Sequence, residues 1–516
     1  MNETGLPGIS LLPRVVIAAC LCLSTSLRAA QVSAEPSGRA GRPNILFCIA
    51  DDWSWPHAGA YGDRVVKTPA FDRVAGEGVL FTRAFCAAPS CTPSRAAILT
   101  GQMPHRLEAG ANLWGFLPAK YPVYPDLLES AGYVVGVRGK GWGPGRPVER
   151  RRNPAGPPAQ SFEQFLASVP EGKPFCFWFG GTDPHRPYDL GSGAEAGLKA
   201  ADVEVPPYLP DTPEVRSDLL DYYAEVQRFD RQVGEILALL EREGKLDETL
   251  VVMTSDNGMP FPRCKANLYD SGSRMPLALR WGARVKGGRK VDAFVSLSDL
   301  GPTFLVAAGL RPSPEMTGRN VLGLVGRAEG GGAEARSWDR VFIERERHAN
   351  VRKGDKGYPA RALRTDRYLY VRNFSPDLWP AGDPEAWKAV GPFGDIDPGP
   401  TKALLLSRRD DPAVAPFFAL ACARRPAEEL YDLEKDPHQV RNVAADPGYG
   451  DDLQRLRRDM DGWMARTADP RAEGGGAYDA FDQYPYFGGP ARGEMESRPR
   501  GPGRQDGAGV RRGPPR

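Results

Sequence analysis

The sequence predicts an α/β fold: a large, mostly parallel sheet sandwiched by helices, with a smaller C-terminal α+β subdomain. Several short segments, of which 44–50 and 175–179 are the clearest, are continuously apolar, as is typical of strands buried on both faces of a parallel sheet. Helical segments alternate with these strands over the first two thirds of the chain. Polar clusters directly follow the strands, at the edge where ligands bind in folds of this kind.

Most of the expected elements can be placed from their apolar patterns. Further strands are expected at 79–84, 133–137, 250–254 and 276–280, and helices at 69–76, 124–131, 213–243 and 300–308. The helix 213–243 has the strongest pattern, because its apolar residues recur every three or four positions between a capping Thr212 and Gly244. We therefore expect a catalytic α/β domain over 41–335.

Beyond about residue 335 the pattern changes. The segments 341–344, 362–365 and 368–372 have the character of antiparallel strands, and 452–465 has that of a terminal helix. This predicts an α+β subdomain over 336–466. The remainder, 467–516, is rich in Gly, Pro and Arg and is expected to be largely disordered.

The first 34 residues have the features of a secretory signal peptide. Arg14 precedes an apolar run over 15–27, and small residues follow it. Two alternatives are an uncleaved anchor and a bacterial lipoprotein attached at Cys20. No later segment is apolar enough to span a membrane. We expect a secreted or periplasmic protein, and a net charge of +2 over 516 residues does not favour a nucleic-acid partner. The sequence does not indicate an oligomeric state.

The stretch 90–101 brings a thiol, an arginine and a helix start together. Pro93 suits the first turn of a helix, Gly101 can end that helix, and Cys91 lies just before it. Helix N-termini favour bound anions. Arg95 lies one turn further on and can point back to the same place. The alternative is a structural cysteine beside a surface arginine.

Four strand ends carry the residue types that an anion-hydrolysing site needs. Asp51-Asp52 and Asp256-Asn257 offer hard oxygen ligands for a divalent cation, the alternatives being a helix cap and a tight turn. Lys140 stands in a glycine-rich loop after a strand, and with Lys265 it would supply cations for anionic oxygens. His185 is the best proton donor or acceptor among five histidines.

These motifs, taken in order, resemble those of the type I sulfatases of the alkaline phosphatase superfamily. The resemblance rests on Asp51-Asp52, the C-x-P-S-R…L-T-G string from Cys91, and Gly139-Lys140. It continues through Asp-Pro-His-Arg at 183–186, Ser-Asp-Asn-Gly at 255–258 and Leu-Tyr-Asp-Leu at 430–433. The stretch 205–269 is especially similar to the sulfamidases, or heparan N-sulfatases.

The resemblance implies a cofactor set and a division of roles. Cys91 would be oxidised to formylglycine by a formylglycine-generating enzyme or an equivalent maturase, and the hydrate of that residue would be the nucleophile. Ca²⁺, or Mg²⁺, would be held by Asp51, Asp52, Asp256, Asn257 and formylglycine at 91. Arg95 would steady that group, Lys140 and Lys265 would bind sulfate, and His185 would protonate the leaving group or bind sulfate.

The chain departs from the family pattern after Lys140. Members commonly have a histidine two or three residues later, where this chain has Gly-Trp-Gly at 141–143. Trp142 could stack on a sugar, or it could be packed in the core. Glu344, His348 and Arg361 lie in a region that resembles a substrate-facing segment of the sulfamidases, and they are further candidates for substrate binding.

We therefore predict a sulfatase acting on a sulfated sugar or glycan, most similar to the N-sulfoglucosamine sulfohydrolases. One alternative is an O-sulfatase acting on a polysaccharide. A second is a phosphonate or phosphate ester hydrolase of the same superfamily. A third, from a different class, is a catalytically silent glycan-binding relative.

Overall fold

The computed structural model of the protein describes residues 41–326, 335–387, 391–473 and 480–488. The expected signal peptide, Cys20 and the last part of the expected tail lie outside these residues. No helix in the described part of the chain combines the length and apolar character that a membrane span requires. The domain boundaries expected from the sequence remain predictions.

The main sheet has eight strands. They are β1 (Asn44–Ala50), β2 (Val79–Phe85), β3 (Val134–Gly139), β4 (Phe175–Gly180), β5 (Thr249–Ser255), β6 (Arg274–Arg280), β7 (Arg289–Val291) and β8 (Val295–Ser296). Their order is β3-β4-β1-β5-β6-β2-β7, and β8 also pairs with β2. All the strands expected in this region are present, and none of their ends is shifted by more than two residues.

All strands of this sheet except β6 point in the same direction, since β7 and β8 run parallel to β2. β1 pairs in parallel with β4 and β5, and β3 pairs in parallel with β4. β6 runs antiparallel to both β5 and β2, which leaves β2 parallel to β5. The carboxyl ends of β1 to β5 therefore meet at one edge of the sheet, where the sequence places the polar clusters.

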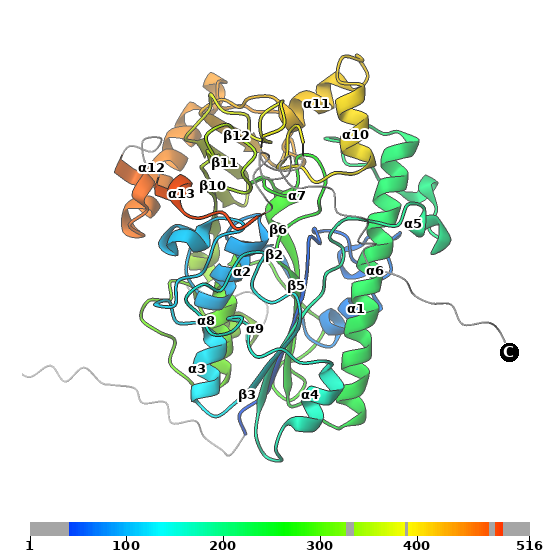
Figure 1. Ribbon diagram of the computed structural model, residues 1–516, viewed down its shortest axis with the longest axis vertical. Helices are drawn as coiled ribbons and strands as arrows, with labels where there is room; N and C mark the ends of the chain where they lie inside the picture. Colours follow the sequence, from blue (N-terminus) through cyan, green and yellow to red (C-terminus); the bar gives the residue numbers. More distant parts are fainter. Residues whose placement is uncertain (1–40, 327–334, 388–390, 474–479, 489–516) are drawn as a thin grey trace, which may run out of the picture. The chain divides into compact units, whose positions relative to one another are not determined.

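Helices cover both faces of the main sheet (Figure 1). One layer contains α1 (Pro69–Gly76), α4 (Phe162–Ser168) and α6 (Pro213–Arg242), and the other contains α2 (Cys91–Thr100), α3 (Tyr124–Ser130) and α8 (Leu300–Ala307). Along β1, Leu46 and Cys48 pack in the first layer, whereas Phe47 and Ile49 pack in the second. Because both faces are buried, the strand is apolar throughout rather than at alternate positions.

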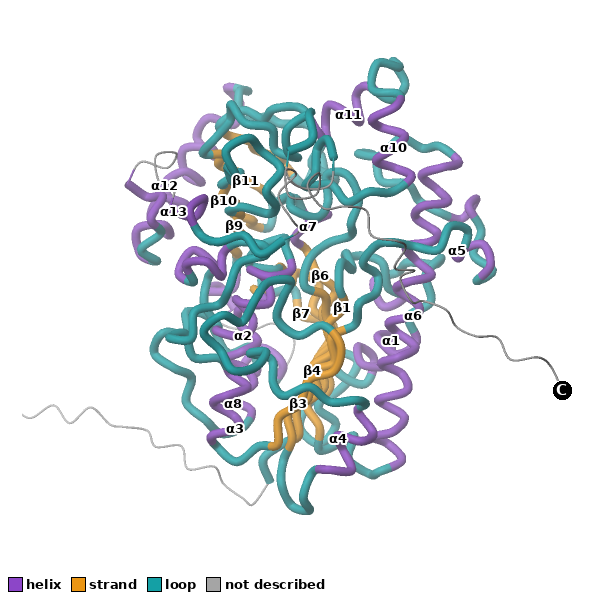
Figure 2. Tube along the Cα trace, viewed as in Figure 1, coloured by secondary structure: helices purple, strands orange, loops and turns teal. Residues whose placement is uncertain are grey.

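A second, antiparallel sheet follows in the C-terminal part of the chain. It contains β9 (Arg340–Arg345), β10 (Ala360–Thr365), β11 (Tyr368–Asn373) and β12 (Glu428–Asp432), in the order β12-β11-β10-β9. Figure 2 shows it above the main sheet, beside α12 (Gly450–Arg466). Short helices complete the fold: α5 (Ser192–Glu195), α7 (Asp270–Ser273), α9 (Leu322–Val325), α10 (Pro400–Ser407), α11 (Ala415–Cys422) and α13 (Ala480–Gln483).

Part of the region expected to be disordered packs against the rest of the protein. Phe481 in α13 is buried, and Arg347 donates hydrogen bonds to backbone carbonyls at Asp482 and Tyr484. Asp469 and Arg471 are buried as well, so the contacts differ from the expectation for both 467–473 and 480–488. The composition of the tail could not predict these hydrogen bonds. Their acceptors are backbone carbonyl groups, which every sequence has.

Candidate active site

Acidic side chains from the ends of β1 and β5 face one another at the carboxyl edge of the main sheet. Asp51 and Asp52 follow β1, and Asp256 follows β5. One ligand atom each of these three residues and of Cys91 lies within 4.8 Å of the others. Asp52 has a φ of 78°, in the left-handed region that aspartate tolerates better than most residues. Its amide donates to Asp256 Oδ1 at 3.1 Å, so this turn locks the two strand ends together.

The cluster fits a hard divalent cation. Its carboxylates are buried beside one another, and the pKa of Asp52 is raised, first by burial and then by the neighbouring carboxylates, although Lys265 opposes the rise. Asn257 Nδ2 donates to Asp52 Oδ1 at 2.7 Å. Asn257 Oδ1 is buried without a hydrogen-bond partner among the described residues. Three carboxylates beside an unpartnered amide oxygen form the kind of donor set that Ca²⁺ and Mg²⁺ prefer.

Cys91 is the first residue of α2 and lies at the centre of this edge. It is 2% exposed, and its Sγ lies 3.4 Å from Asp51 Oδ1. Burial raises the pKa of the thiol well above its ordinary range; Lys140 opposes this rise, and Asp51 and Asp256 add to it. A thiol that stays protonated is a poor nucleophile. The encoded cysteine is therefore not suited to attack by itself.

Arg95, one helical turn after Cys91, is completely buried. Its Nε donates to Asp256 Oδ2 at 2.7 Å, and one terminal nitrogen donates to the carbonyl oxygen of Lys140 at 2.6 Å. The other terminal nitrogen donates to the carbonyl oxygen of Ala50 at 3.3 Å. The arginine therefore ties α2 to the ends of β1, β3 and β5, and the surface-arginine alternative is wrong.

Each of the two adjacent aspartates is paired with its own lysine. Lys140 Nζ donates to Asp51 Oδ1 and Oδ2 at 2.7 and 2.6 Å, and Lys265 Nζ donates to Asp52 Oδ2 at 2.7 Å. Burial alone would lower the pKa of both lysines, but the carboxylates raise it. The same pairing holds the pKa of Asp51 well below its ordinary value despite burial. Both ammonium groups are charged and can bind anionic oxygens.

Lys140 owes its position to two glycines. Gly139 has a φ of 76°, and a Cβ there would lie 2.0 Å from the carbonyl oxygen of Gly180. A Cβ on Gly180 would lie 1.8 Å from the carbonyl oxygen of Lys140. The ends of β3 and β4 can approach this closely only because neither residue has a side chain.

His185 follows β4 and is the most open of the predicted catalytic groups, with 37% of its side chain exposed. Its Nδ1 lies 2.5 Å from the carbonyl oxygen of Arg186. Because a carbonyl oxygen only accepts, Nδ1 carries a proton, and Nε2 is the atom that can exchange one. Nε2 lies 3.9 Å from Asp52 Oδ2, so the exchangeable position faces the acidic cluster.

Two of the weaker candidates lie close to this edge. His348 Nδ1 is 2.8 Å from the hydroxyl of Ser90, the residue before Cys91. Trp142 follows Lys140 but is only 5% exposed, and its ring belongs to the hydrophobic layer that contains α2, α3 and α8. The structure therefore favours the packing alternative for Trp142 over stacking on a sugar.

Glu344 and Arg361 belong to a buried cluster of charged side chains, although Glu344 also lines a small cavity with Ser90 and His348. Glu344 accepts from His105 Nδ1 at 2.7 Å, and Arg361 donates to Asp469 at 2.6 and 3.0 Å. Both candidates are completely buried and satisfied by these partners. The structure does not place either side chain among the open groups of the sheet edge. The sequence suggested a substrate contact because their region resembles a substrate-facing segment of the sulfamidases. In the structure the two residues pair across β9 and β10.

One residue of the site was not predicted. Asp397 Oδ2 lies 3.0 Å from Lys265 Nζ, and ligand atoms of Asp52, His185 and Asp397 lie within 4.8 Å of one another. Asp397 stands in the long connection between β11 and β12, and it follows no strand of the main sheet. The rule that identified the other site residues therefore gave no signal for it.

The chain matches the family model described as Sulfatase over residues 43–144 and 158–310. Human N-sulphoglucosamine sulphohydrolase is 31% identical over 488 residues, which cover 84% of this chain and 92% of that protein. An ulvan-active sulfatase from Formosa agariphila is 26% identical over 491 residues, which cover 83% and 76% respectively. The chain therefore belongs to the sulfatase family, which confirms the resemblance and the class of hydrolase predicted from the sequence.

A solved structure agrees with the fold. A protein in complex with its substrate D-glucosamine-2-N,6-O-disulfate superposes with a TM-score of 0.61 at 19% identity, covering 84% of this chain and 100% of that one. This confirms the predicted fold class. Membership of the sulfatase family implies a metal ion and a formylglycine, and the buried cluster around Cys91 fits a metal site.

Proposed function

We propose that the protein hydrolyses the sulfamate group of an N-sulfated glucosamine or a glycan that contains it. The observation that carries the proposal is the convergence on Cys91 of a metal-type carboxylate cluster and two charged lysines. The resemblance of 205–269 to the sulfamidases supports the N-sulfate, as does the similarity to human N-sulphoglucosamine sulphohydrolase along 92% of that protein.

In this proposal the side chains of the site have different roles. Lys140 and Lys265 bind two anionic oxygens of the substrate, at a place where burial strengthens the attraction. Arg95 holds Asp256 and the Lys140 loop in register. His185 Nε2 gives a proton to the atom that leaves sulfur, because an amine or alcohol leaves more readily when neutral.

Two groups added to the chain complete the site in this proposal. Asp51, Asp52, Asp256 and the Asn257 amide oxygen would hold Ca²⁺, or Mg²⁺, which neutralises their charge and attracts an anionic group. Formylglycine at position 91 would supply a hydroxyl nucleophile as its hydrate. A maturase would form it in the unfolded chain, since Cys91 is inaccessible once folded, and residues 1–34 would direct export.

Mass spectrometry of the peptide that contains Cys91 tests the maturation step. Protein made in its native host should give this peptide about 18 Da lighter than the cysteine form, because oxidation of the thiol to an aldehyde removes that mass. The Cys91→Ala variant, expressed alongside, should show neither the aldehyde nor sulfate release. A native preparation that carries only unmodified Cys91 would exclude the proposal.

The linkage is tested with two matched substrates. The protein should release sulfate from glucosamine N-sulfate and not, or much more slowly, from glucosamine 6-sulfate. Release from the 6-sulfate alone would instead favour an O-sulfatase, the alternative supported by the similarity to an ulvan-active sulfatase. Release of phosphonate or phosphate from ester substrates, with no sulfate release, would favour the ester hydrolases of the same superfamily.

A further inference from the structure

Asp397 is held over the site by a loop that is anchored on both sides. On one side, Asp395 accepts from Arg345 at 2.6 Å and from Arg352 at 2.7 Å, and all three are buried. On the other side, the amide and hydroxyl of Thr401 donate to Asp218 at 3.1 and 2.6 Å. Between these anchors the Asp397 carboxylate has little freedom to move away.

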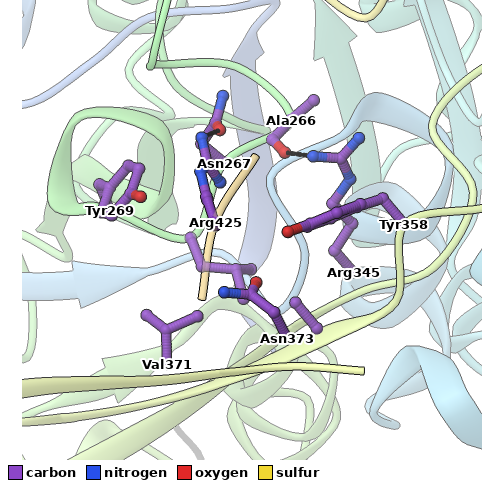
Figure 3. Close-up of a pocket in the computed structure, with 10 residues that line it drawn as sticks. Ala266, Asn267, Tyr269, Arg345, Tyr358, Val371, Asn373 and Arg425 are labelled. Atoms are coloured by element: carbon purple, nitrogen blue, oxygen red, sulfur yellow. Dashed lines mark hydrogen bonds between the residues drawn. The ribbon is translucent and has the colours of Figure 1, made fainter. Parts of the chain in front are cut away.

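The same anchors also fix the two catalytic groups nearest to Asp397. Arg345 donates to the carbonyl oxygen of Ala266, the residue after Lys265, as Figure 3 shows. Asp218 accepts from Arg186, the residue after His185, at 2.8 Å. The cavity drawn in Figure 3, which Ala266 and Arg345 line, has a volume of about 10 Å³, which is too small for a sugar. The substrate therefore does not bind in this cavity.

Exposure increases from the nucleophile outward. Cys91 is 2% exposed and the Lys265 side chain 5%, whereas the side chains of Asp397 and His185 are 22% and 37% exposed. A group that leaves sulfur departs on the side opposite the attacking atom, by analogy with in-line phosphoryl transfer. Asp397 and His185 therefore lie where the leaving group emerges.

Asp397 keeps acceptor capacity despite its ion pair. Its Oδ2 lies 3.0 Å from Lys265 Nζ but off the direction of a hydrogen bond, so the pair is ionic rather than hydrogen-bonded. Oδ2 itself is buried, so the exposed part of the side chain lies away from it. A carboxylate this close to a sulfate-binding lysine weakens the attraction of that lysine for any anion. The Asp397 carboxylate therefore favours binding of a substrate only if the substrate places a hydrogen-bond donor or a cation next to it.

We propose that Asp397 recognises the amine nitrogen that leaves sulfur, and so selects sulfamates over sulfate esters. This inference rests on the proposed function. When the oxygen–sulfur bond forms, the sulfur–nitrogen bond breaks and its electron pair goes to nitrogen. The nitrogen takes a proton from His185 and, at neutral pH, a second proton from water, which leaves an ammonium. A sulfate ester leaves a neutral alcohol, which a carboxylate attracts less.

The test compares the binding of two sugars that differ at one atom. D-Glucosamine carries an ammonium where D-glucose carries a hydroxyl. Wild-type protein should bind glucosamine about tenfold more tightly or better, because hydrogen bonds to charged groups are worth that much. The preference should fall to about twofold or less in Asp397→Asn and persist in Asp397→Glu. Calorimetry or inhibition measures it, and Asp411→Asn, on an exposed loop, is the control.

The two proposals can fail separately. If wild-type protein releases sulfate from glucosamine N-sulfate while Asp397→Asn keeps the full preference for glucosamine, the role of Asp397 is excluded and the function stands. If no sulfate is released but Asp397→Asn alone abolishes the preference, the recognition stands and the function does not. Equal melting temperatures of Asp397→Asn and wild type exclude misfolding as the cause, and Asp397→Glu supplies the same check by its activity.

Discussion

Among single residues, Arg95 connects the largest part of the site through one buried guanidinium. We expect Arg95→Lys to reduce activity and weaken the fold, because an ammonium cannot reproduce the planar fork that serves Asp256 and the carbonyls at Lys140 and Ala50. The free energy of unfolding should fall by about 3 kcal/mol, as when a buried pair is broken. Sulfate release should fall about a hundredfold, since the Lys140 loop loses its anchor.

Chemical denaturation and a sulfate assay measure both effects. The matched control is Arg83→Lys, whose partner Asp366 is largely exposed, and its stability should change by less than about 0.5 kcal/mol. If Arg95→Lys unfolds at the same denaturant concentration as wild type, the anchoring role assigned to Arg95 is wrong.

The carboxylate cluster predicts a response to metal removal. A chelator should lower the melting temperature, because Asp51, Asp52 and Asp256 then repel one another without a cation, and added Ca²⁺ should restore it. Asn257→Ala removes the unpartnered amide oxygen, and we expect it to weaken Ca²⁺ at least about tenfold. The shift of the melting temperature with Ca²⁺ concentration gives both affinities. A melting temperature that changes with neither chelator nor Ca²⁺ would contradict the metal assignment.

At the scale of residues, the sequence predicted those site residues that directly follow a strand of the main sheet. Asp51, Lys140, His185 and Asp256 each follow a parallel strand, so topology alone brings them together. Asp397 could not be predicted in this way, because its place depends on how a loop of the C-terminal subdomain folds back over Lys265. The burial of Trp142 also depends on packing partners that are distant in the chain.

At the scale of elements, two glycines should respond in opposite ways to the same substitution. Gly234 lies in α6, where an added Cβ would meet only the Ala70 Cβ at 3.7 Å, an ordinary contact. Gly234→Ala should therefore stabilise the protein by about 0.5–1 kcal/mol, because alanine is the better helix former. Gly180→Ala should destabilise it and displace Lys140, whose carbonyl oxygen a Cβ would meet at 1.8 Å. Thermal unfolding and sulfate release separate the two outcomes.

The elements that the sequence predicted best are those with a regular pattern over many residues. The helix expected over 213–243 is α6, Pro213–Arg242, and its cap at Thr212 accepts from the Val215 amide. The strand β1 has the expected bounds, because a doubly buried strand is apolar at every position. In contrast, α10 and α11 were not predicted. The sequence of α11, APFFALAC, is apolar throughout, so no helical period is visible in it.

At the scale of the whole molecule, the two sheets are joined by buried polar contacts. His105, which follows α2, is bonded to Glu344 in β9, and Arg345 of the same strand contacts the carbonyl oxygen after Lys265. The site consequently combines Lys265 from the main domain with His348 and Asp397 from the C-terminal part. The sequence predicted both sheets, but their mutual placement depends on these long-range contacts, which leave no local pattern.

The burial of His348 between these parts makes the stability of the molecule depend on pH. Burial lowers the pKa of His348 to about 4, whereas an unfolded histidine titrates near 6.5. Between these pH values the unfolded chain binds a proton at His348 that the folded protein does not. The contribution of His348 to the free energy of unfolding is therefore fully present above about pH 6.5 and is lost as the pH falls through 4. The loss should be on the order of 3 kcal/mol. Urea unfolding at several pH values should therefore show a shallower acid loss in His348→Gln, which can still bond to Ser90. Parallel curves for the two proteins would mean that His348 titrates normally.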